Sequence, residues 1–229
     1  MDFLLEGMGM AFLLLWQGDS ETYTAIIASL KTSSYSLTAS LAIGLPCGYL
    51  LGFFNFRGRK TIRLTVDTLL ALPTVFIGLL VYAFLSRRGP LGGLGLLFTL
   101  EGIAIGQTIL ALPIIVALTA AAVEGLDRSL RPTLISLGAS KRQLFLSTLW
   151  EARLGILTAA VTAIGRVLTE VGISMMVGGN IKWHTRTMTT AIALETNKGQ
   201  FALGIALGMV LLAIAFSVNL SLSFLRRRG

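Results

Sequence analysis

Charge, cysteine and histidine are scarce in this chain of 229 residues, and each scarcity excludes a class of protein. Only 13% of the residues are charged and 54% are hydrophobic, whereas a soluble domain carries about a quarter of charged residues. The single cysteine, Cys47, excludes an intrachain disulfide, and its apolar neighbours predict a small packing residue. The single histidine, His184, excludes a metal site built on histidines. Together with a mean hydropathy of +0.80, these absences predict a protein of the lipid bilayer.

Motifs of catalysis and of nucleotide binding are absent as well. The chain contains no Gly-Lys dipeptide and hence no phosphate-binding loop of the G-x-x-x-x-G-K-[ST] kind. It has neither G-x-S-x-G nor H-E-x-x-H, which argues against an intramembrane protease. A carrier driven by an ion gradient would be expected to hold several carboxylates or histidines at membrane depth, and one clear case is present. We therefore expect no enzyme, and the gradient-driven carrier is the alternative function from another class.

Five apolar runs are long enough to cross a hydrocarbon core of about 30 Å, which requires roughly 20 helical residues. They cover about 36–54, 66–85, 102–122, 154–177 and 202–224. The sequence therefore predicts an all-α membrane protein with five transmembrane helices, in one domain over residues 1–229.

The first 16 residues form a shorter apolar run that contains Asp2 and Glu6. This run lacks a basic start and a small-residue cleavage site, which argues against a cleaved signal peptide. We expect a helix lying in the membrane interface, with a sixth span as the alternative. Residues 21–31 continue as an amphipathic lead, so that 1–35 is expected to be an N-terminal interfacial and lead-in segment.

Basic residues are distributed unequally between the two sets of loops. One set, with the C-terminal end, holds twelve: Arg57, Arg59, Lys60, Arg63, Arg128, Arg131, Lys141, Arg142, Arg153, Arg226, Arg227 and Arg228. The other set holds six: Lys31, Arg87, Arg88, Lys182, Arg186 and Lys198. Because cytoplasmic loops collect Lys and Arg, we expect the N-terminus outside and the C-terminus in the cytoplasm. The net charge of +8 follows from this bias and does not indicate nucleic-acid binding.

The longest loop predicted to be cytoplasmic, 124–153, contains residues typical of the beginnings and ends of two short helices. Pro132 suits a first helical turn, and Gly138 can adopt the left-handed conformation that ends a helix. Ser140 and Gln143 have the spacing of a capping box that opens the next helix. The loop is therefore predicted to hinge at Gly138, and a helix resting on lipid headgroups is the alternative.

Arg166 and Glu170 lie within the fourth apolar run, where each costs roughly 2.5–3.5 kcal/mol to insert. Their spacing of four places them on one face of a helix, where each neutralises the other. One interpretation is an ion pair that makes insertion tolerable. The other is that both face a subunit interface and line or gate a pathway.

The predicted outside loop 177–196 is rich in hydrogen-bond donors. Asn180, Thr185 and Arg186 are the candidates for an outer mouth that attracts an oxyanion or the protein delivering one. An ordinary solvated loop is the alternative.

Prolines and glycines in the runs predict how the helices bend and pack. Pro46, Pro73 and Pro113 fall within spans and are expected to kink them. The G-x-x-x-G patterns at 102–106 and 204–208 favour close helix packing, which we expect within one subunit.

The run from Glu124 to Leu157 resembles the cytoplasmic loop of binding-protein-dependent ABC importer permeases. The likeness rests on Leu137-Gly138-Ala139-Ser140 followed by basic residues, with Glu124-Gly125 near the position where the family often has Glu-Ala. The usual Leu-Pro ending is replaced by Ala152-Arg153-Leu154-Gly155. In that family the loop forms coupling helices that dock into a groove on the ATPase subunit. The resemblance implies that the residues coupled to the ATPase are Leu137, Gly138, Ala139, Ser140, Lys141, Arg142 and Phe145.

Three further segments extend the resemblance over most of the chain. They are TAIIASLKTSSYSLTASLAIGLPCGYLLG, ALPTVFIGLLVYAFLSRRGPLG and EVGISMMVGGNI with the following HTRTMTTAIALET. They resemble tungstate-importing permeases and, more distantly, molybdate permeases. The resemblance implies a fold like that of type I ABC importer permeases and transport of a tetrahedral oxyanion. Tungstate is the expected cargo, and molybdate or another oxyanion is the alternative.

The same resemblance implies an assembly in the cytoplasmic membrane of a prokaryote. A homodimer of this chain, also favoured by the frequency of two-fold symmetry, would join two ATP-binding cassette subunits and an extracytoplasmic substrate-binding protein. ATP and Mg would be bound by the partner ATPase, so no cofactor is expected in this chain. Anion-importing permeases of the family have a similar Arg-x-x-x-Glu followed by Gly, which favours a pathway role for Arg166 and Glu170.

Overall fold

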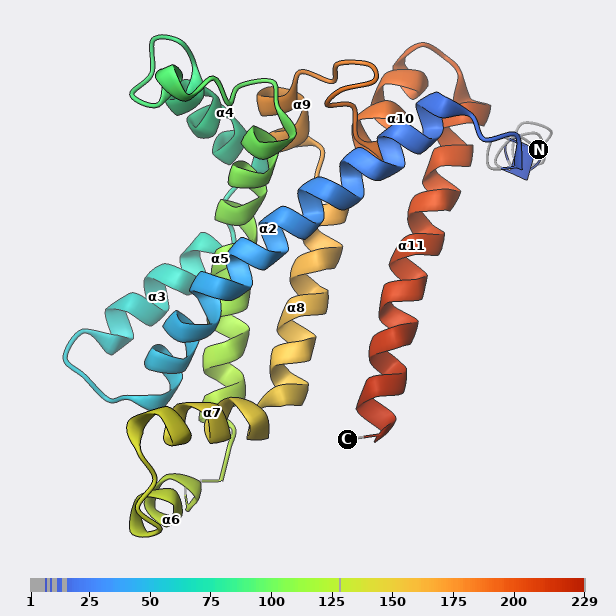
Figure 1. The fold of residues 1–229 in the computed structure, drawn as a ribbon. Helices are drawn as coiled ribbons and strands as arrows, with labels where there is room; N and C mark the ends of the chain where they lie inside the picture. The colour runs from blue at the N-terminus through green and yellow to red at the C-terminus, as the bar shows by residue number, and fades with distance from the viewer. Residues whose placement is uncertain (1–6, 8, 10–11, 14–15, 128, 229) are drawn as a thin grey trace.

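The computed structural model describes residues 7, 9, 12–13, 16–127 and 129–228, with the backbone alone for residue 219 and residues 221–228. The regular structure of these residues is helical throughout, so the predicted all-α class is confirmed (Figure 1). The helices are α2 (Ser20–Phe53), α3 (Arg59–Leu69), α4 (Thr74–Leu85), the 3-10 turn η1 (Gly92–Leu94), α5 (Leu100–Glu124), α6 (Leu130–Ser136), α7 (Lys141–Glu151), α8 (Arg153–Leu168), α9 (Gly172–Gly178), α10 (Met188–Asn197) and α11 (Phe201–Arg228). The interfacial helix predicted for residues 1–16 falls largely outside the described residues.

Helices α2, α5 and α11 are each long and apolar enough to cross a membrane, and two bent helix pairs bring the number of candidate spans to five. The bent pairs are α3 with α4, at 98°, and α7 with α8, at 68°. The predicted number of spans is thus matched, but two of the spans are not straight helices.

Helix α2 is one continuous helix of 34 residues and is about 50 Å long at 1.5 Å per residue. The later part of the predicted lead-in segment and the first predicted span therefore form one helix. The Asp19 carboxylate caps the helix by accepting from the Thr22 N–H at 2.7 Å. Buried hydroxyls further along, such as those of Thr32 and Ser36, donate to carbonyls of their own helix. Because these hydroxyls satisfy themselves locally, a polar stretch can continue an apolar helix.

The second predicted span is broken at Pro73, which caps α4 and does not lie within it. Proline lacks an N–H and disfavours helix at the preceding residue, so the chain turns before α4 begins. The expected kink at this proline is therefore a complete break. Pro46 and Pro113, by contrast, lie inside α2 and α5.

The fourth predicted span, 154–177, is also not a single helix, because α8 ends at Leu168 and α9 begins at Gly172. The Glu170 carboxylate accepts the Ile173 N–H at 3.0 Å, so that a side chain satisfies a donor at the start of α9. The break between α8 and α9 is therefore stabilised by the acidic residue itself.

Helix α5 is the central helix, and two apolar clusters pack against it. One cluster joins α5 to α4 and α9 through Ile77, Val81 and Ile173, and the other joins it to α2 and α8. A Cβ at Gly106 would lie 2.4 Å from Ile173 Cγ2, so this glycine permits close packing within the chain, as expected. Gly208, in contrast, faces open space, and Cys47 is exposed and not packed.

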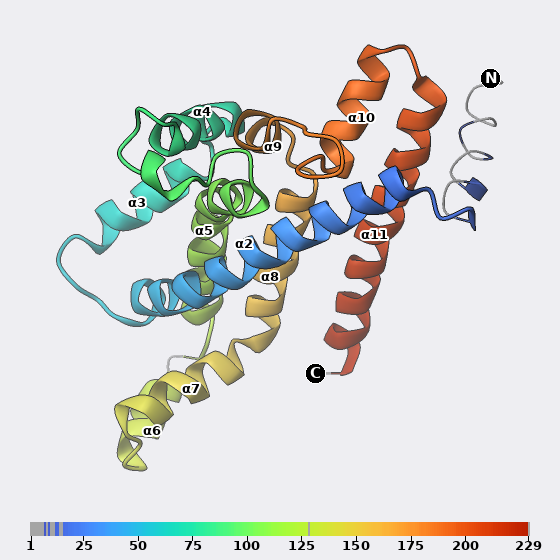
Figure 2. The same cartoon turned by 45° about the horizontal axis from the view of Figure 1, so that its top comes forward.

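The two ends of the molecule hold different elements. Helices α6 and α7 and the C-terminal end of α11 lie at one end, and α4, α9, α10 and the start of α2 lie at the other (Figures 1 and 2). The loops predicted to share the cytoplasmic side therefore lie at the same end. We call it the inner end and the opposite one the outer end.

Candidate functional site

The predicted coupling loop, residues 124–153, consists of two short helices joined at Gly138, as expected. Gly138 has φ +77°, and the Ala139 N–H donates to the Leu134 carbonyl at 3.0 Å, which closes α6. Ser140 and Gln143 then form the predicted capping box: the Ser140 Oγ accepts the Gln143 N–H at 3.3 Å, and the Gln143 Oε1 accepts the Ser140 N–H at 2.8 Å. The hinge is therefore set by backbone conformation and local hydrogen bonds.

The coupling loop exposes apolar side chains at the inner end of the molecule. Leu137 is 77% exposed and Trp150 is 71% exposed, and Ile135 and Leu146 are also exposed. Lys141 and Arg142 are exposed beside them, whereas Ala139 is half-buried. Exposed apolar side chains rimmed by charge are typical of a protein interaction surface. Sequence reasoning included Leu137 in this surface but missed Trp150 and Leu146.

Phe145 differs from the other predicted coupling residues, because its ring lies against the bundle. Its centroid is 4.7 Å from that of Tyr49 in α2, in an edge-on arrangement. Leu149 and Ile156 pack in the same apolar cluster. The geometry therefore assigns Phe145 to the inward face of α7.

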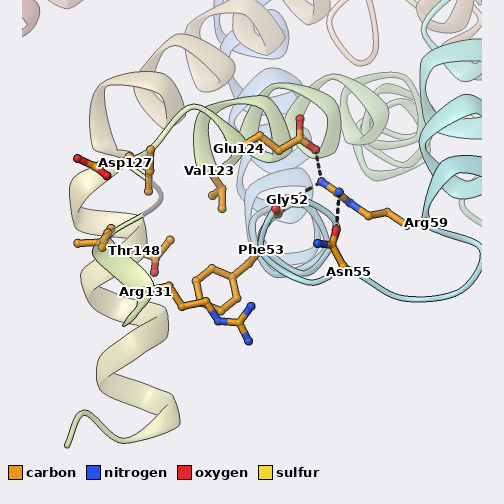
Figure 3. A pocket seen from close by; sticks show the side chains of 11 residues that line it. Gly52, Phe53, Asn55, Arg59, Val123, Glu124, Asp127, Arg131 and Thr148 are labelled. Carbon is orange, nitrogen blue, oxygen red and sulfur yellow. Dashed lines mark hydrogen bonds and ion pairs between the residues drawn. The ribbon is translucent and has the colours of Figure 1, made fainter. Parts of the chain in front are cut away.

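A cleft of about 480 Å³ lies between the coupling loop and the inner ends of α2 and α5 (Figure 3). On one side Arg59 donates to Glu124 at 2.7 Å and to Asn55 at 2.8 Å. On the other side Arg131 stacks over the Phe53 ring at 4.8 Å. The side chains on both walls therefore tie neighbouring elements to one another.

Asp127, which also lines this cleft, accepts the Ser129 N–H at 2.8 Å. Hydrogen bonds from Ser129 lower the pKa of Asp127 below its ordinary value. The carboxylate therefore stays ionised at neutral pH.

Arg166 and Glu170 form the predicted ion pair, with 3.6 Å between Nη1 and Oε2. They do not share a helix, however, because Glu170 follows the end of α8. The Glu170 side chain is 2% exposed and that of Arg166 is 43% exposed. In the single chain, Arg166 therefore reaches the surface, whereas Glu170 is held inside it.

Glu170 lies in a group of buried polar side chains that sequence reasoning missed. This polar cluster is closely packed, with no room for a water molecule, and comprises Ser29, Thr32, Ser33, Gln107, Glu170, Ser174, Thr187 and Thr189. Thr189 donates to the Glu170 carbonyl at 2.8 Å, and the Gln107 Oε1 is buried without a hydrogen-bond partner among the described residues. The one signal in the sequence was Gln107, an amide within an otherwise apolar run.

The three candidate residues of the outer mouth lie partly or fully inside the loop 177–196. Thr185 is fully buried, donates to the Gly178 carbonyl and accepts the Ile181 N–H at 3.1 Å. Arg186 is largely buried and pairs with Glu21 of α2. Asn180 has φ +50°, and its Oδ1 is buried without a partner among the described residues. These residues hold the loop in a tight fold, whereas residues 181–184 between them are exposed.

Among the described residues, no group of three or more His, Cys, Asp or Glu side chains is arranged so that it could hold a metal ion.

Comparison with known proteins places this geometry in a family. The chain is 45% identical over 227 residues to the tungstate uptake system permease protein TupB of Campylobacter jejuni, covering 99% of this chain and 95% of that protein. It is 29% identical over 209 residues to the molybdenum transport system permease protein ModB of Escherichia coli, covering 84% and 91% of the two chains.

Among solved structures, a bacterial alginate ABC transporter in complex with an alginate-bound periplasmic protein has a similar fold. The TM-score is 0.76 at 20% identity, over 97% of this chain and 86% of that one. The predicted likeness to type I ABC importer permeases is confirmed at the level of the fold. The family model of the binding-protein-dependent transport system inner membrane component matches residues 44–228, and this chain belongs to that family.

Proposed function

We propose that this chain is the membrane-spanning subunit of an ATP-driven importer that moves tungstate across the cytoplasmic membrane. The observation that carries the proposal is the 45% identity to a tungstate permease over nearly the full length of both chains. Molybdate is the second candidate because a molybdenum permease is related over most of the chain and because the two oxyanions share shape and charge.

In this proposal the chain works as a homodimer with two separate ATPase subunits, which bind ATP and Mg, and with an extracytoplasmic binding protein. The exposed apolar surface formed by Leu137, Trp150 and their neighbours supports ATPase docking, since it is otherwise unprotected from water. A similar fold is known in complex with a periplasmic protein. The chain itself contributes no cofactor and no hydrolysis.

The inner end is proposed to face the cytoplasm, with the N-terminus outside and the C-terminus inside. The excess of Lys and Arg in loops predicted to lie on that side supports this orientation. An impermeant thiol reagent should label Lys141→Cys, in a chain carrying Cys47→Ala, from the cytoplasmic side alone. Labelling of this variant in intact cells would contradict the orientation.

The pathway is proposed to pass Arg166 at the interface of the two copies. A half-exposed guanidinium facing lipid would be costly, whereas at a dimer interface it can attract an oxyanion. Glu170 holds this guanidinium from the buried side. Asn180, Thr185 and Arg186 are proposed to shape the outer mouth by keeping its loop folded.

The test is uptake by the complete importer in vesicles. Permease, ATPase and loaded binding protein are reconstituted together, and tungstate accumulation is measured with ATP, with molybdate and sulfate as competitors. We expect ATP-dependent accumulation that molybdate inhibits more strongly than sulfate. Uptake of another class of solute, with no tungstate accumulation, would overturn the proposal.

A further inference from the structure

The coupling helices are attached to α2 through a compact group of rings and one cation. Phe145 of α7 meets Tyr49 edge-on at 4.7 Å, and Tyr49 stacks on Phe53 one turn later at 4.8 Å. Arg131 of α6 lies over the rings of Phe53 and Phe54 at 4.8 and 5.7 Å. We call these five side chains the aromatic clamp. Each coupling helix therefore reaches α2 through a different residue.

The clamp leaves α7 with two different faces. On α7, Phe145 points to the bundle, whereas Leu146 and Trp150 are exposed. On α6, the guanidinium of Arg131 reaches back to α2 from an exposed position. A partner bound to the exposed face of α7 would therefore act on α2 through the opposite face.

Helix α2 runs without a break from the clamp to the outer end. Near its beginning Glu21 pairs with Lys182 at 2.7 Å and with Arg186. About two turns further on, the Ser29 hydroxyl accepts the Met188 N–H at 2.8 Å. The helix thus contacts the coupling loop at one end and the loop before α10 at the other.

We propose that Arg131 and Phe145 are positioning residues that fasten the coupling helices to α2, and that α2 carries their displacement to the outer loop. This inference rests on the proposed function, since it assigns the route by which ATPase motion reaches the transport pathway. Motion could otherwise pass along the chain, from α6 into α5 and from α7 into α8 at Ala152, or through the apolar cluster that holds Leu149 of α7 and Val123 of α5. These routes remain in every clamp variant, so the variants isolate the contribution of α2.

The test uses the complete importer with Arg131→Gln and, separately, Phe145→Leu. Uptake of tungstate per ATP hydrolysed and the stimulation of hydrolysis by loaded binding protein are measured for each. Because the coupling free energy between two sites commonly corresponds to a factor of 5 or more, we expect uptake per ATP to fall on the order of fivefold. Hydrolysis without binding protein should stay near the wild-type rate.

Matched controls make the same two substitutions, Arg to Gln and Phe to Leu, at residues outside the clamp at the same end of the molecule. Arg57 is exposed and forms no ion pair among the described residues, and Phe56 is exposed outside the clamp. Arg57→Gln and Phe56→Leu should leave uptake per ATP unchanged. Arg131→Lys and Phe145→Tyr, which keep the cation and the ring, should restore most of the ratio.

A double-mutant cycle separates direct contact from general loosening. Tyr49→Leu and Phe145→Leu together should reduce uptake per ATP by less than the product of their single effects, because both remove the same contact.

The inference would be overturned by an unchanged uptake per ATP in Arg131→Gln. The side chain of Arg131 is exposed, so this variant should fold, and co-purification with the ATPase checks its assembly. Failure of the wild-type importer to accumulate tungstate would instead overturn the proposed function.

Discussion

The coupling loop at the inner end and the polar cluster around Glu170 are opposite in construction. The coupling loop exposes apolar side chains such as Leu137 and Trp150, and its shape is fixed by Gly138 and the capping box. The polar cluster buries a carboxylate, an amide and several hydroxyls beside the break between α8 and α9. An exposed apolar surface gains free energy by meeting a partner, whereas a buried polar cluster favours a particular arrangement of the chain. The first region is therefore suited to receive motion and the second to hold a conformation.

Gly138→Val should cause the largest loss, because it acts on the hinge of the coupling loop. Its φ of +77° is strained for a residue with a branched side chain, by roughly 1–2 kcal/mol or more. We expect stimulation of hydrolysis by loaded binding protein to fall on the order of tenfold. Gly208→Val, at a helical glycine facing open space, is the control. Undiminished stimulation in Gly138→Val would refute the role of the hinge.

The double variant Arg166→Met with Glu170→Leu should come next in effect. It removes both charges together, so insertion should be retained while the polar cluster loses its carboxylate and the surface loses its cation. We expect normal amounts of protein in the membrane and tungstate uptake several-fold below the wild type, roughly as one or two charge-assisted hydrogen bonds would give. Lys60 and Asp67 are exposed residues of opposite charge on α3, which has no buried residue. Lys60→Met with Asp67→Leu should transport normally, and equal uptake by both double variants would show that Arg166 and Glu170 serve insertion alone.

Removing the exposed partner alone sharpens the same point. In Arg166→Met, Glu170 keeps its bond from the Ile173 N–H but loses a cation that is 43% exposed and 3.6 Å away, so stability should fall by about 1–2 kcal/mol, less than for a fully buried pair. Thermal unfolding of the purified chain in detergent measures this loss. Adding Glu170→Gln removes the uncompensated charge and keeps an oxygen that accepts the Ile173 N–H, so stability should be restored, and a double variant less stable than Arg166→Met would contradict this.

Glu21→Gln should have a smaller effect, confined to the outer end. The substitution removes the partner of Lys182 and Arg186, and the largely buried Arg186 loses most by it. We expect a loss of about 1 kcal/mol that shrinks at high salt. Glu151→Gln, at an exposed position, is the control for unfolding measurements. A loss that does not depend on salt would argue against the ion pairs as its cause.

Ser140→Ala should have the smallest effect of the five substitutions. It removes the cap of α7 while Gly138 still closes α6, and loss of an N-cap costs about 1 kcal/mol. Hydrogen exchange at the first turn of α7 should accelerate by roughly fivefold, with little change in α2. Ser136→Ala, which removes a hydroxyl bonded only within α6, should leave α7 unaffected. Unchanged exchange in Ser140→Ala would show that packing of Phe145 alone sets the start of the helix.

The coupling loop could be predicted from the sequence because its determinants are local. A glycine with a left-handed backbone and a serine three residues before a glutamine act within a few residues of themselves. The direction of Phe145 could not be predicted, because both faces of α7 are apolar and the choice depends on Tyr49 of α2. Tertiary contact alone decides which aromatic side chain is buried.

The breaks in the second and fourth spans could not be read from hydropathy, which registers composition and not backbone direction. Glu170 was interpreted as a helical partner of Arg166, yet its carboxylate binds the backbone of α9. Thr185 was expected to belong to an outer mouth, yet it is buried because its hydroxyl finds an acceptor inside the fold, the Gly178 carbonyl. Likewise, the polar part of α2 was assigned to a separate segment because its self-satisfied hydroxyls count as polar in any hydropathy scale.

The most direct test of the account compares vesicles holding the permease alone with vesicles that also hold the ATPase and the binding protein. Tungstate accumulation is measured in both, with ATP and with an imposed proton or sodium gradient. The account predicts accumulation in the complete assembly with ATP and none by the permease alone under any gradient. Accumulation by the permease alone, driven by an ion gradient, would contradict it and identify a secondary carrier.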